Sequence, residues 1–116
     1  KLIKMMHRTV LLFLVLCTIG ALAELWNIEV TNNAGTTVRV DIEGRRHCIC
    51  LEHSQTAKIK NTNGGLMRLF STNDCKGNFA GLDKGKTVSN AQWVNSASVG
   101  ISGIPSTGPY DCTGIF

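Results

Sequence analysis

Apolar and polar residues alternate along two neighbouring segments near the start of the chain, 26–31 and 38–43. The apolar positions are Trp26, Ile28, Val30, Val38, Val40 and Ile42. Alternation with a period of two is typical of a strand with one buried and one exposed face. Because the turn-forming residues 32–35 separate the two segments, we predict that they pair as a β-hairpin.

Shorter alternating runs follow at 47–51, 57–60 and 67–70, and the polar, glycine-rich segment 61–65 is the strongest break between them. In the first of these runs Cys48 and Cys50 share one face, which we expect to point at the core. No segment after residue 23 has the periodicity of a helix. Short strands separated by turn signals every 8 to 12 residues or so favour an all-β sandwich or barrel.

One stretch specifies a sharp bend. Phe70 ends an alternating run, and the polar residues 71–74 supply turn chemistry before Cys75 and Gly77. Asn and Asp side chains satisfy their own backbone in such a bend, and Gly77 accepts a positive φ that a branched residue would resist. We therefore predict a strand that folds back on itself.

The spacing of this bend resembles the Greek-key motif of the βγ-crystallins, in which an aromatic, four variable residues, a second aromatic, one residue and a glycine follow one another. Phe70, Cys75 and Gly77 occupy these positions, and Cys75 stands where the family usually has an aromatic. The resemblance continues beyond the bend. Phe79 is similar to the start of the family's second strand, and 93–98 is similar to the stretch from a tryptophan to a serine that ends a motif.

This resemblance implies an all-β, Greek-key β-sandwich in which the motif or core residues are Phe70, Gly77, Phe79, Trp93 and Ser98. A disulfide at Cys75 would replace aromatic packing under the bend. A βγ-crystallin domain holds two such motifs. Residues 26–60 are long enough for four strands but lack the aromatic spacing, so a second motif is left open.

The first 23 residues have the composition of a secretory signal peptide. A basic segment, 1–8, precedes the apolar run 9–19, and an Ala-x-Ala sequence ends at Ala23. The apolar run is short for a bilayer-spanning helix, which needs about 20 apolar residues. An uncleaved anchor is the alternative. We expect cleavage after Ala23, no membrane anchor, and one secreted domain over 24–116.

The charge of the chain gives no indication of a nucleic-acid partner. The chain has 12 basic and 8 acidic residues, but three of the basic residues and none of the acidic ones lie in the first 23, so the secreted part is nearly neutral. Only Arg45, Arg46 and His47 form a compact basic group, which we expect to be a solvated turn. We predict a monomer with an extracellular protein or cell-surface partner and no nucleic acid.

Four cysteines follow the leader: Cys48, Cys50, Cys75 and Cys112. An even number in an exported chain favours two disulfides. Cys48 and Cys50 are too close for a comfortable mutual bridge. Two pairings remain open: 48 to 75 with 50 to 112, or 48 to 112 with 50 to 75.

The sequence gives only weak support for a metal site. A zinc site is an alternative to the disulfides, with the ligands Cys48, Cys50, His47 and His53, although Cys-x-Cys is not a usual zinc spacing. In the run that corresponds to the family's calcium-binding sequence, 94–99, only Asn95 and Ser98 are candidate ligands. Calcium prefers six to eight oxygens, several of them anionic, and this run has no carboxylate. We expect no metal and no cofactor.

Candidate catalytic residues are limited to His53 beside Glu52, which together could act as an acid and base pair as in a small secreted ribonuclease. Neighbours in a strand point to opposite faces, however, and the chain has no phosphate loop, nucleophile elbow or metalloprotease helix motif. An aromatic platform for a sugar, from Trp26, Trp93 and Tyr110, is the alternative to a core position for both tryptophans. We predict that the protein is not an enzyme.

Function does not follow from fold alone. Small secreted proteins with this architecture include antifungal and killer-toxin-like proteins and a metalloprotease inhibitor, and the chain resembles the small cysteine-containing secreted proteins of fungi. The resemblance implies an effector, toxin or antimicrobial that recognises a surface through the loops 44–47, 61–65 and 104–110. The alternatives are an inhibitor of a secreted protease, acting through 106–111, and a structural component of a matrix or wall.

Overall fold

The computed structural model describes residues 25–109, 112 and 114–116, so the expected signal peptide lies outside the described residues. Eight strands form: β1 (Leu25–Asn32), β2 (Thr37–Glu43), β3 (Arg46–Cys50), β4 (Thr56–Asn63), β5 (Met67–Phe70), β6 (Phe79–Leu82), β7 (Thr87–Val88) and β8 (Ser96–Gly100). The described residues include no helix long and apolar enough to cross a membrane.

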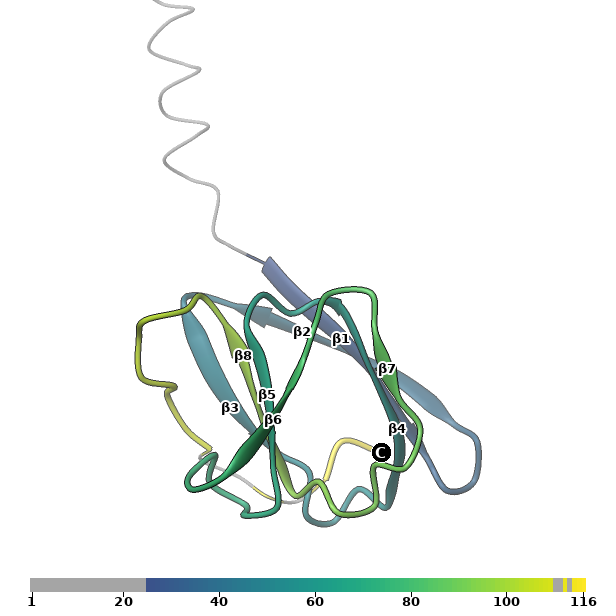
Figure 1. Cartoon of the computed structure of the whole chain (residues 1–116). Coiled ribbons are helices and arrows are strands. Elements are labelled where there is room, and N and C mark those ends of the chain that lie inside the picture. The colour runs from purple at the N-terminus through teal and green to yellow at the C-terminus, as the bar shows by residue number, and fades with distance from the viewer. Residues whose placement is uncertain (1–24, 110–111, 113) are drawn as a thin grey trace, which may run out of the picture.

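The strands make two four-stranded antiparallel sheets (Figure 1). Sheet 1 has the order β2-β1-β4-β7, and sheet 2 has the order β3-β8-β5-β6. Each sheet takes three strands from one half of the chain and one from the other half, because β3 joins sheet 2 and β7 joins sheet 1. The two halves are therefore interlocked, and the prediction of an all-β protein with two sheets is confirmed.

The first hairpin forms as the alternation predicts. β1 pairs with β2 in a register that places Trp26 opposite Ile42 and Ile28 opposite Val40. At the far end, the Asn32 side-chain oxygen accepts hydrogen bonds from the backbone N–H groups of Ala34 (3.0 Å) and Thr36 (2.9 Å). An Asn oxygen that satisfies its own turn in this way stabilises the tight connection between the strands.

The core lies between the two sheets and draws on both halves of the chain. Its buried members are Ile28, Val30, Leu51, Ile59, Met67, Leu69, Ala91, Val94, Ala97 and Val99, and several half-buried residues, among them Trp26 and Ile49, pack against it. All five residues of β8 are buried. A strand in which both faces are buried must be covered on both sides, so sheet 2 has cover outside the sandwich as well as inside it.

The outer cover of sheet 2 corrects the expected direction of the cysteines. Cys48 and Cys50 share a face, as predicted, but their pairing partners in β8 are Ser98 and Ser96, whereas the core residue Ala97 lies opposite Ile49. Because successive strand residues point to opposite faces, the two cysteines face away from the core. They are buried on the outer face of sheet 2.

Two disulfides hold the cover in place. Cys48 is bonded to Cys75 in the bend after β5, and Cys50 is bonded to Cys112 in the C-terminal tail. Two disulfides are thus confirmed, in the first of the two pairings that the sequence left open. Both bonds start from β3, so this one edge strand anchors two irregular segments.

The bend over residues 71–78 folds back onto sheet 2 with the geometry that its sequence predicts. Cys75 and Gly77 both have positive φ, 58° and 92°. The Ser96 hydroxyl accepts a hydrogen bond from the Cys75 N–H (2.9 Å) and donates one to the Thr72 carbonyl (2.6 Å). Ser96, rather than Ser98, therefore fastens the bend to β8.

Three further expectations are wrong. Trp93 is not a core residue, because 42% of it is exposed, and Phe79 is 51% exposed although β6 forms where predicted. The segment 61–65 is not an exposed loop, because β4 continues to Asn63 and Asn61 is fully buried. The Asn61 amide donates to the Leu82 carbonyl (2.7 Å), and its oxygen accepts from the Gly64 N–H (2.6 Å). A buried amide with both ends satisfied is stable inside the protein.

Candidate functional site

Two open pockets lie on either side of β3. The first, which we name the edge cleft, lies between the edge strands β2 and β3 and has a volume of about 520 Å³. Its lining includes the polar residues Asp41, Glu43 and His47 and the apolar residues Ile42, Ile49 and Ile115. The second, which we name the arginine pocket, has a volume of about 310 Å³ and lies on the outer face of sheet 2.

The polar side chains of the edge cleft are used within the protein. The His47 Nε2–H donates to the Glu43 carbonyl (2.8 Å), which fixes this ring against the turn at 43–47. The Asp41 carboxylate accepts from Arg39 Nε at 2.9 Å, and both side chains are more than half exposed. Exposed pairs of this kind contribute little free energy. The edge cleft therefore contains one hydrogen-bonded histidine, His47, and two solvent-exposed acids, Asp41 and Glu43.

The arginine pocket has a floor of strand residues and two walls of irregular chain. Its floor consists of Arg46, Ser98, Arg68 and Phe70, from β3, β8 and β5. One wall is the bend, with Asp74, Cys75 and Lys76, and the other is the loop with Ile104, Pro105, Ser106 and Gly108. The Cys48–Cys75 disulfide joins this first wall to β3, so a covalent bond fixes the position of the wall.

Arg46 is held rigidly at one end of this floor. It is 5% exposed, and its Nη1 donates to the carbonyl oxygens of Leu66 (2.9 Å), Ile101 (3.3 Å) and Gly100 (3.4 Å). Burial lowers the pKa of the Arg46 guanidinium, and the positive charge of nearby Arg68 lowers this pKa further. The group nevertheless stays protonated at neutral pH, because a guanidinium is not deprotonated in proteins.

Arg68 and Ser98 present donors that the described residues leave unused. The two residues lie directly opposite each other in neighbouring strands. Ser98 is 2% exposed, and neither its hydroxyl nor the buried Nε of Arg68 has a hydrogen-bond partner in the part of the chain that the structure describes. The Arg68 guanidinium carbon lies 4.2 Å from the centre of the Phe79 ring, and this cation–π contact limits its movement.

The balance of charge in the arginine pocket is positive. Arg46, Arg68 and Lys76 contribute three positive charges, and Asp74 is the described acid in the lining. Within the described ranges, the one ion pair of the protein joins Arg39 to Asp41 on the other sheet. The guanidinium groups of the pocket are thus not neutralised by a described carboxylate.

The structure separates the weak calcium candidates. Asn95 lies in a small cavity of about 140 Å³ with Glu52 and Gln92, whereas Ser98 lies in the arginine pocket. The Asn95 amide donates to the Ser71 carbonyl (2.7 Å), which is a loop-stabilising role. These two residues do not line a common site.

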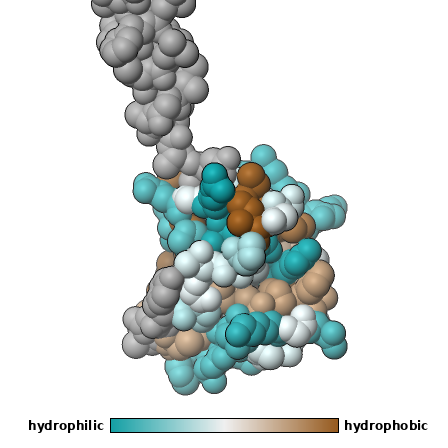
Figure 2. Space-filling model, turned by 90° about the vertical axis from the view of Figure 1, so that its left-hand side faces the viewer, coloured by the Kyte–Doolittle hydropathy of each residue, from teal (hydrophilic) through white to brown (hydrophobic). Residues whose placement is uncertain are grey.

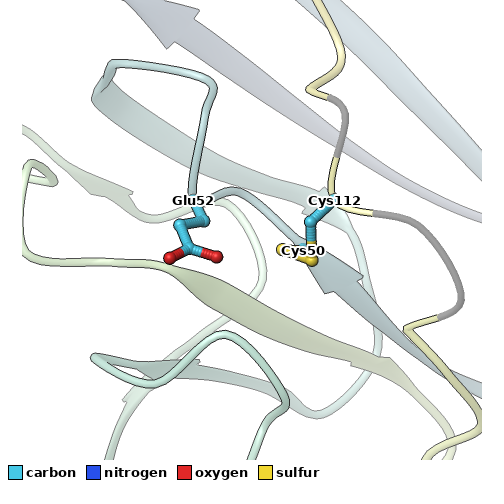
Figure 3. A group of neighbouring side chains, drawn as sticks. All are labelled: Cys50, Glu52 and Cys112. Atoms are coloured by element: carbon cyan, nitrogen blue, oxygen red, sulfur yellow. A yellow bond between two sulfur atoms is a disulfide. The ribbon is translucent and has the colours of Figure 1, made fainter.

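A second group of potential metal ligands, Cys50, Glu52 and Cys112, comes together at the end of β3 (Figure 3). The two sulfur atoms are bonded to each other, and a disulfide sulfur is not the thiolate that metal ions require. The Glu52 carboxylate accepts from the Asn73 amide (2.9 Å). This group is therefore a bracing contact between the bend and the chain after β3, and the zinc alternative loses two ligands.

The remaining predicted positions are not brought together. His53 lies in an exposed turn and lines none of the three pockets described above. Trp26 donates from its Nε1 to the Gly44 carbonyl (2.7 Å), and Trp93 is exposed. Tyr110 and Asp111 lie outside the described residues. The described part of the proposed inhibitor loop is fixed to β3, because Thr107 accepts from the Cys48 N–H (2.9 Å) and donates to the Arg46 carbonyl (3.1 Å).

The arginine pocket is not predicted from the sequence, because the basic residues at 45–47 are expected to form a solvated turn. The sequence does contain an indication of this face. Arg46 is two residues before Cys48 and four before Cys50, and Arg68 is two residues before Phe70. Residues that alternate with each other share a face. A face that carries disulfide-bonded cysteines is covered by the segments bonded to them.

The side of the molecule that carries the loop 101–109 has a mixed surface. Hydrophilic and hydrophobic residues are interspersed over it, and hydrophobic groups form only small areas in this view (Figure 2). Comparisons with models of known protein families, with curated proteins and with solved structures gave no match to the chain.

Proposed function

We propose that this chain is a secreted, non-enzymatic recognition protein of the effector, toxin or antimicrobial type, built on a βγ-crystallin-like pair of Greek-key motifs. The observation that carries the proposal is the covalent bracing of irregular chain on one face of a sandwich. Both disulfides fix loops, the bend and the tail, to β3. Loops held on a rigid scaffold are the usual place for binding residues.

The strand order supports the Greek-key part of the proposal. In a Greek key, the fourth strand returns to lie beside the first. β4 lies beside β1, and β8 lies beside β5. Each half also passes its third strand to the opposite sheet. The equivalence of the halves supports a second motif over β1 to β4, although that half lacks the aromatic spacing of the bend at 70–77.

Secretion is supported by the disulfides and by the leader-like sequence at the N-terminus. Disulfides persist in oxidising compartments and are rare in the cytosol. We expect a eukaryotic host that expresses the full chain to release into the medium a protein that starts at Glu24. Intact mass and N-terminal sequencing measure this directly. Retention of the uncleaved chain in the membrane fraction would contradict it.

Recognition is tested with the oxidised protein collected from such a medium. We expect saturable binding to, or growth inhibition of, at least one of fungal, bacterial or plant cells. A reduced and alkylated sample is the control, because it keeps the composition of the protein and loses the bracing. Equal binding by both samples, or no effect on any cell type, would count against the proposal.

An inhibitor would bind a secreted protease and be cleaved slowly, and a wall component would self-associate without any partner. Both outcomes are measured in the same preparation, by incubation with proteases and by sedimentation. Either result would replace the proposal.

A further inference from the structure

We propose that the arginine pocket binds the oxyanion group of a small organic molecule, a carboxylate, sulfate or phosphate. This inference deepens the proposed function, on which it rests for its biological meaning, by naming the chemistry that the braced face recognises. Its physical basis is independent of that function, because it lies in the donors, charges and shape of the pocket.

The first argument is the set of unused donors. The Ser98 hydroxyl is buried and has no partner among the described residues, and the same is true of Arg68 Nε. A buried polar group without a hydrogen bond destabilises a protein. Two such groups lie opposite each other in adjacent strands, and both residues line one pocket. Because both atoms are covered in this structure, an oxyanion bonds to them after a small rotation of the two side chains toward the pocket.

The second argument is electrostatic. Arg46 and Arg68 are close enough for the charge of Arg68 to lower the pKa of Arg46, so the two guanidinium groups repel each other. An oxyanion between them replaces this repulsion by attraction. Arginine is the side chain best suited to the purpose, because its planar fork binds carboxylate, sulfate and phosphate oxygens in pairs.

The third argument is rigidity. Arg46 is fixed by three backbone carbonyls, Arg68 rests on Phe79, and the Cys48–Cys75 disulfide sets the position of the wall. A pocket whose walls and backbone are already in place loses little conformational freedom when the ligand binds. Arginines that are held in place without a described carboxylate partner differ from the mobile side chains of a solvated surface.

The size and walls of the pocket indicate an organic ligand rather than a bare ion. A volume of about 310 Å³ is near the lower end of the range for small-molecule sites, roughly 300 to 1,000 Å³. Phe70, Ile104 and Pro105 add apolar surface beside the charged floor. Such a pocket fits an acidic sugar or another small organic acid, with its charged group on the floor and its carbon skeleton against the walls.

The test is an NMR titration of the oxidised protein with acetate, galacturonate, sulfate and phosphate in separate arms at constant ionic strength. The readouts are the backbone amides and the Arg68 Nε–H resonance. We expect saturable shifts at Arg68, Ser98 and Lys76, with galacturonate tighter than acetate if the apolar walls contribute. The arm that saturates at the lowest concentration identifies the class of oxyanion.

Three variants make the result specific. Arg68→Gln removes a charged donor and should weaken binding by about tenfold or more, and Ser98→Ala should weaken it by about threefold or more. Arg39→Gln removes one positive charge from the other sheet and should leave affinity unchanged. Dispersed amide spectra and the absence of free thiols establish that each variant is folded. Arg46 is left intact, because its three carbonyl contacts make it a structural residue as well.

Absence of saturable shifts in all four arms would overturn the proposal, as would equal affinity in the native protein and Arg68→Gln. Shifts that spread over exposed basic residues and weaken as much in Arg39→Gln as in Arg68→Gln would also overturn it, because they indicate non-specific attraction. Cell binding that persists in Arg68→Gln while ligand shifts are lost would retain the recognition function and reject this pocket as its site. Ligand shifts without any cell binding would retain the pocket as a ligand site and reject the recognition function.

Discussion

Two serines of β8 provide a matched pair for testing how the bend is held. Ser96 and Ser98 are both buried and lie on the same face of the strand. The Ser96 hydroxyl makes two hydrogen bonds to the bend, to the Cys75 N–H and the Thr72 carbonyl. The Ser98 hydroxyl makes none to the described residues. Substitution by alanine therefore removes the same atom at both positions, but it breaks hydrogen bonds to described residues only at Ser96.

We expect Ser96→Ala to lower the free energy of unfolding by about 2 to 4 kcal/mol, since each lost hydrogen bond contributes about 0.5 to 1.5 kcal/mol and each backbone group left without a partner adds a desolvation term. We expect Ser98→Ala to change it by less than about 0.5 kcal/mol, or to raise it slightly, because an unpaired buried hydroxyl is removed. The small cavity is similar in both variants and cancels in the comparison.

The assay is chemical unfolding of the oxidised variants, monitored by tryptophan fluorescence and analysed with a common slope. Hydrogen exchange supplies a local readout, because the Cys75 amide should lose protection in Ser96→Ala alone. Equal destabilisation by both substitutions, or a larger effect at Ser98, would refute the assignment of Ser96 as the fastening residue.

Phe70→Ala should lower stability by about 3 to 5 kcal/mol, because Phe70 is 5% exposed under the bend; a change near zero in the same unfolding assay would contradict its packing role. Gly100→Ala should lower it by about 2 to 4 kcal/mol, because φ is +131° and a Cβ would lie 2.7 Å from the Arg46 Cα and overlap the Arg45 carbonyl. Gly35→Ala, which has positive φ but open space, is the control that isolates the overlap, and an equal loss there would remove this argument. The double variant Cys50→Ala and Cys112→Ala opens a loop whose ends are 62 residues apart and should lose about 4 kcal/mol on the chain-entropy model; a midpoint equal to that of the native protein would show that the tail does not contribute to stability.

Much of the fold could be predicted from alternation and turn residues. The hairpin of β1 and β2, the shared face of Cys48 and Cys50, and the bend with positive φ at Gly77 all follow from local sequence. These features depend on near neighbours, and the period of a strand fixes which residues share a face.

The direction of each face could not be predicted in the same way. Sheet 2 is covered on both sides, by sheet 1 within and by the bend and tail outside, so a buried residue on it can belong to either layer. Arg46 was expected in solvent and Trp93 in the core, and both expectations are wrong. The alternation of residues along a strand shows which side chains share a face, but it does not show which layer that face packs against. The outer layer is formed by residues distant in sequence. The arginine pocket lies in this outer layer.

The attachment of both disulfides to β3 has a consequence for the behaviour of the protein in a reducing solution. β3 is an edge strand of sheet 2, and the backbone of Thr107 pairs with its free side. An uncovered strand edge is a template for pairing with another chain. Reduction releases both segments that are bonded to β3 and leaves its edge without covalent protection. We therefore expect the reduced protein to associate through the edge of β3 more readily than the oxidised protein, and sedimentation of the two forms measures this difference.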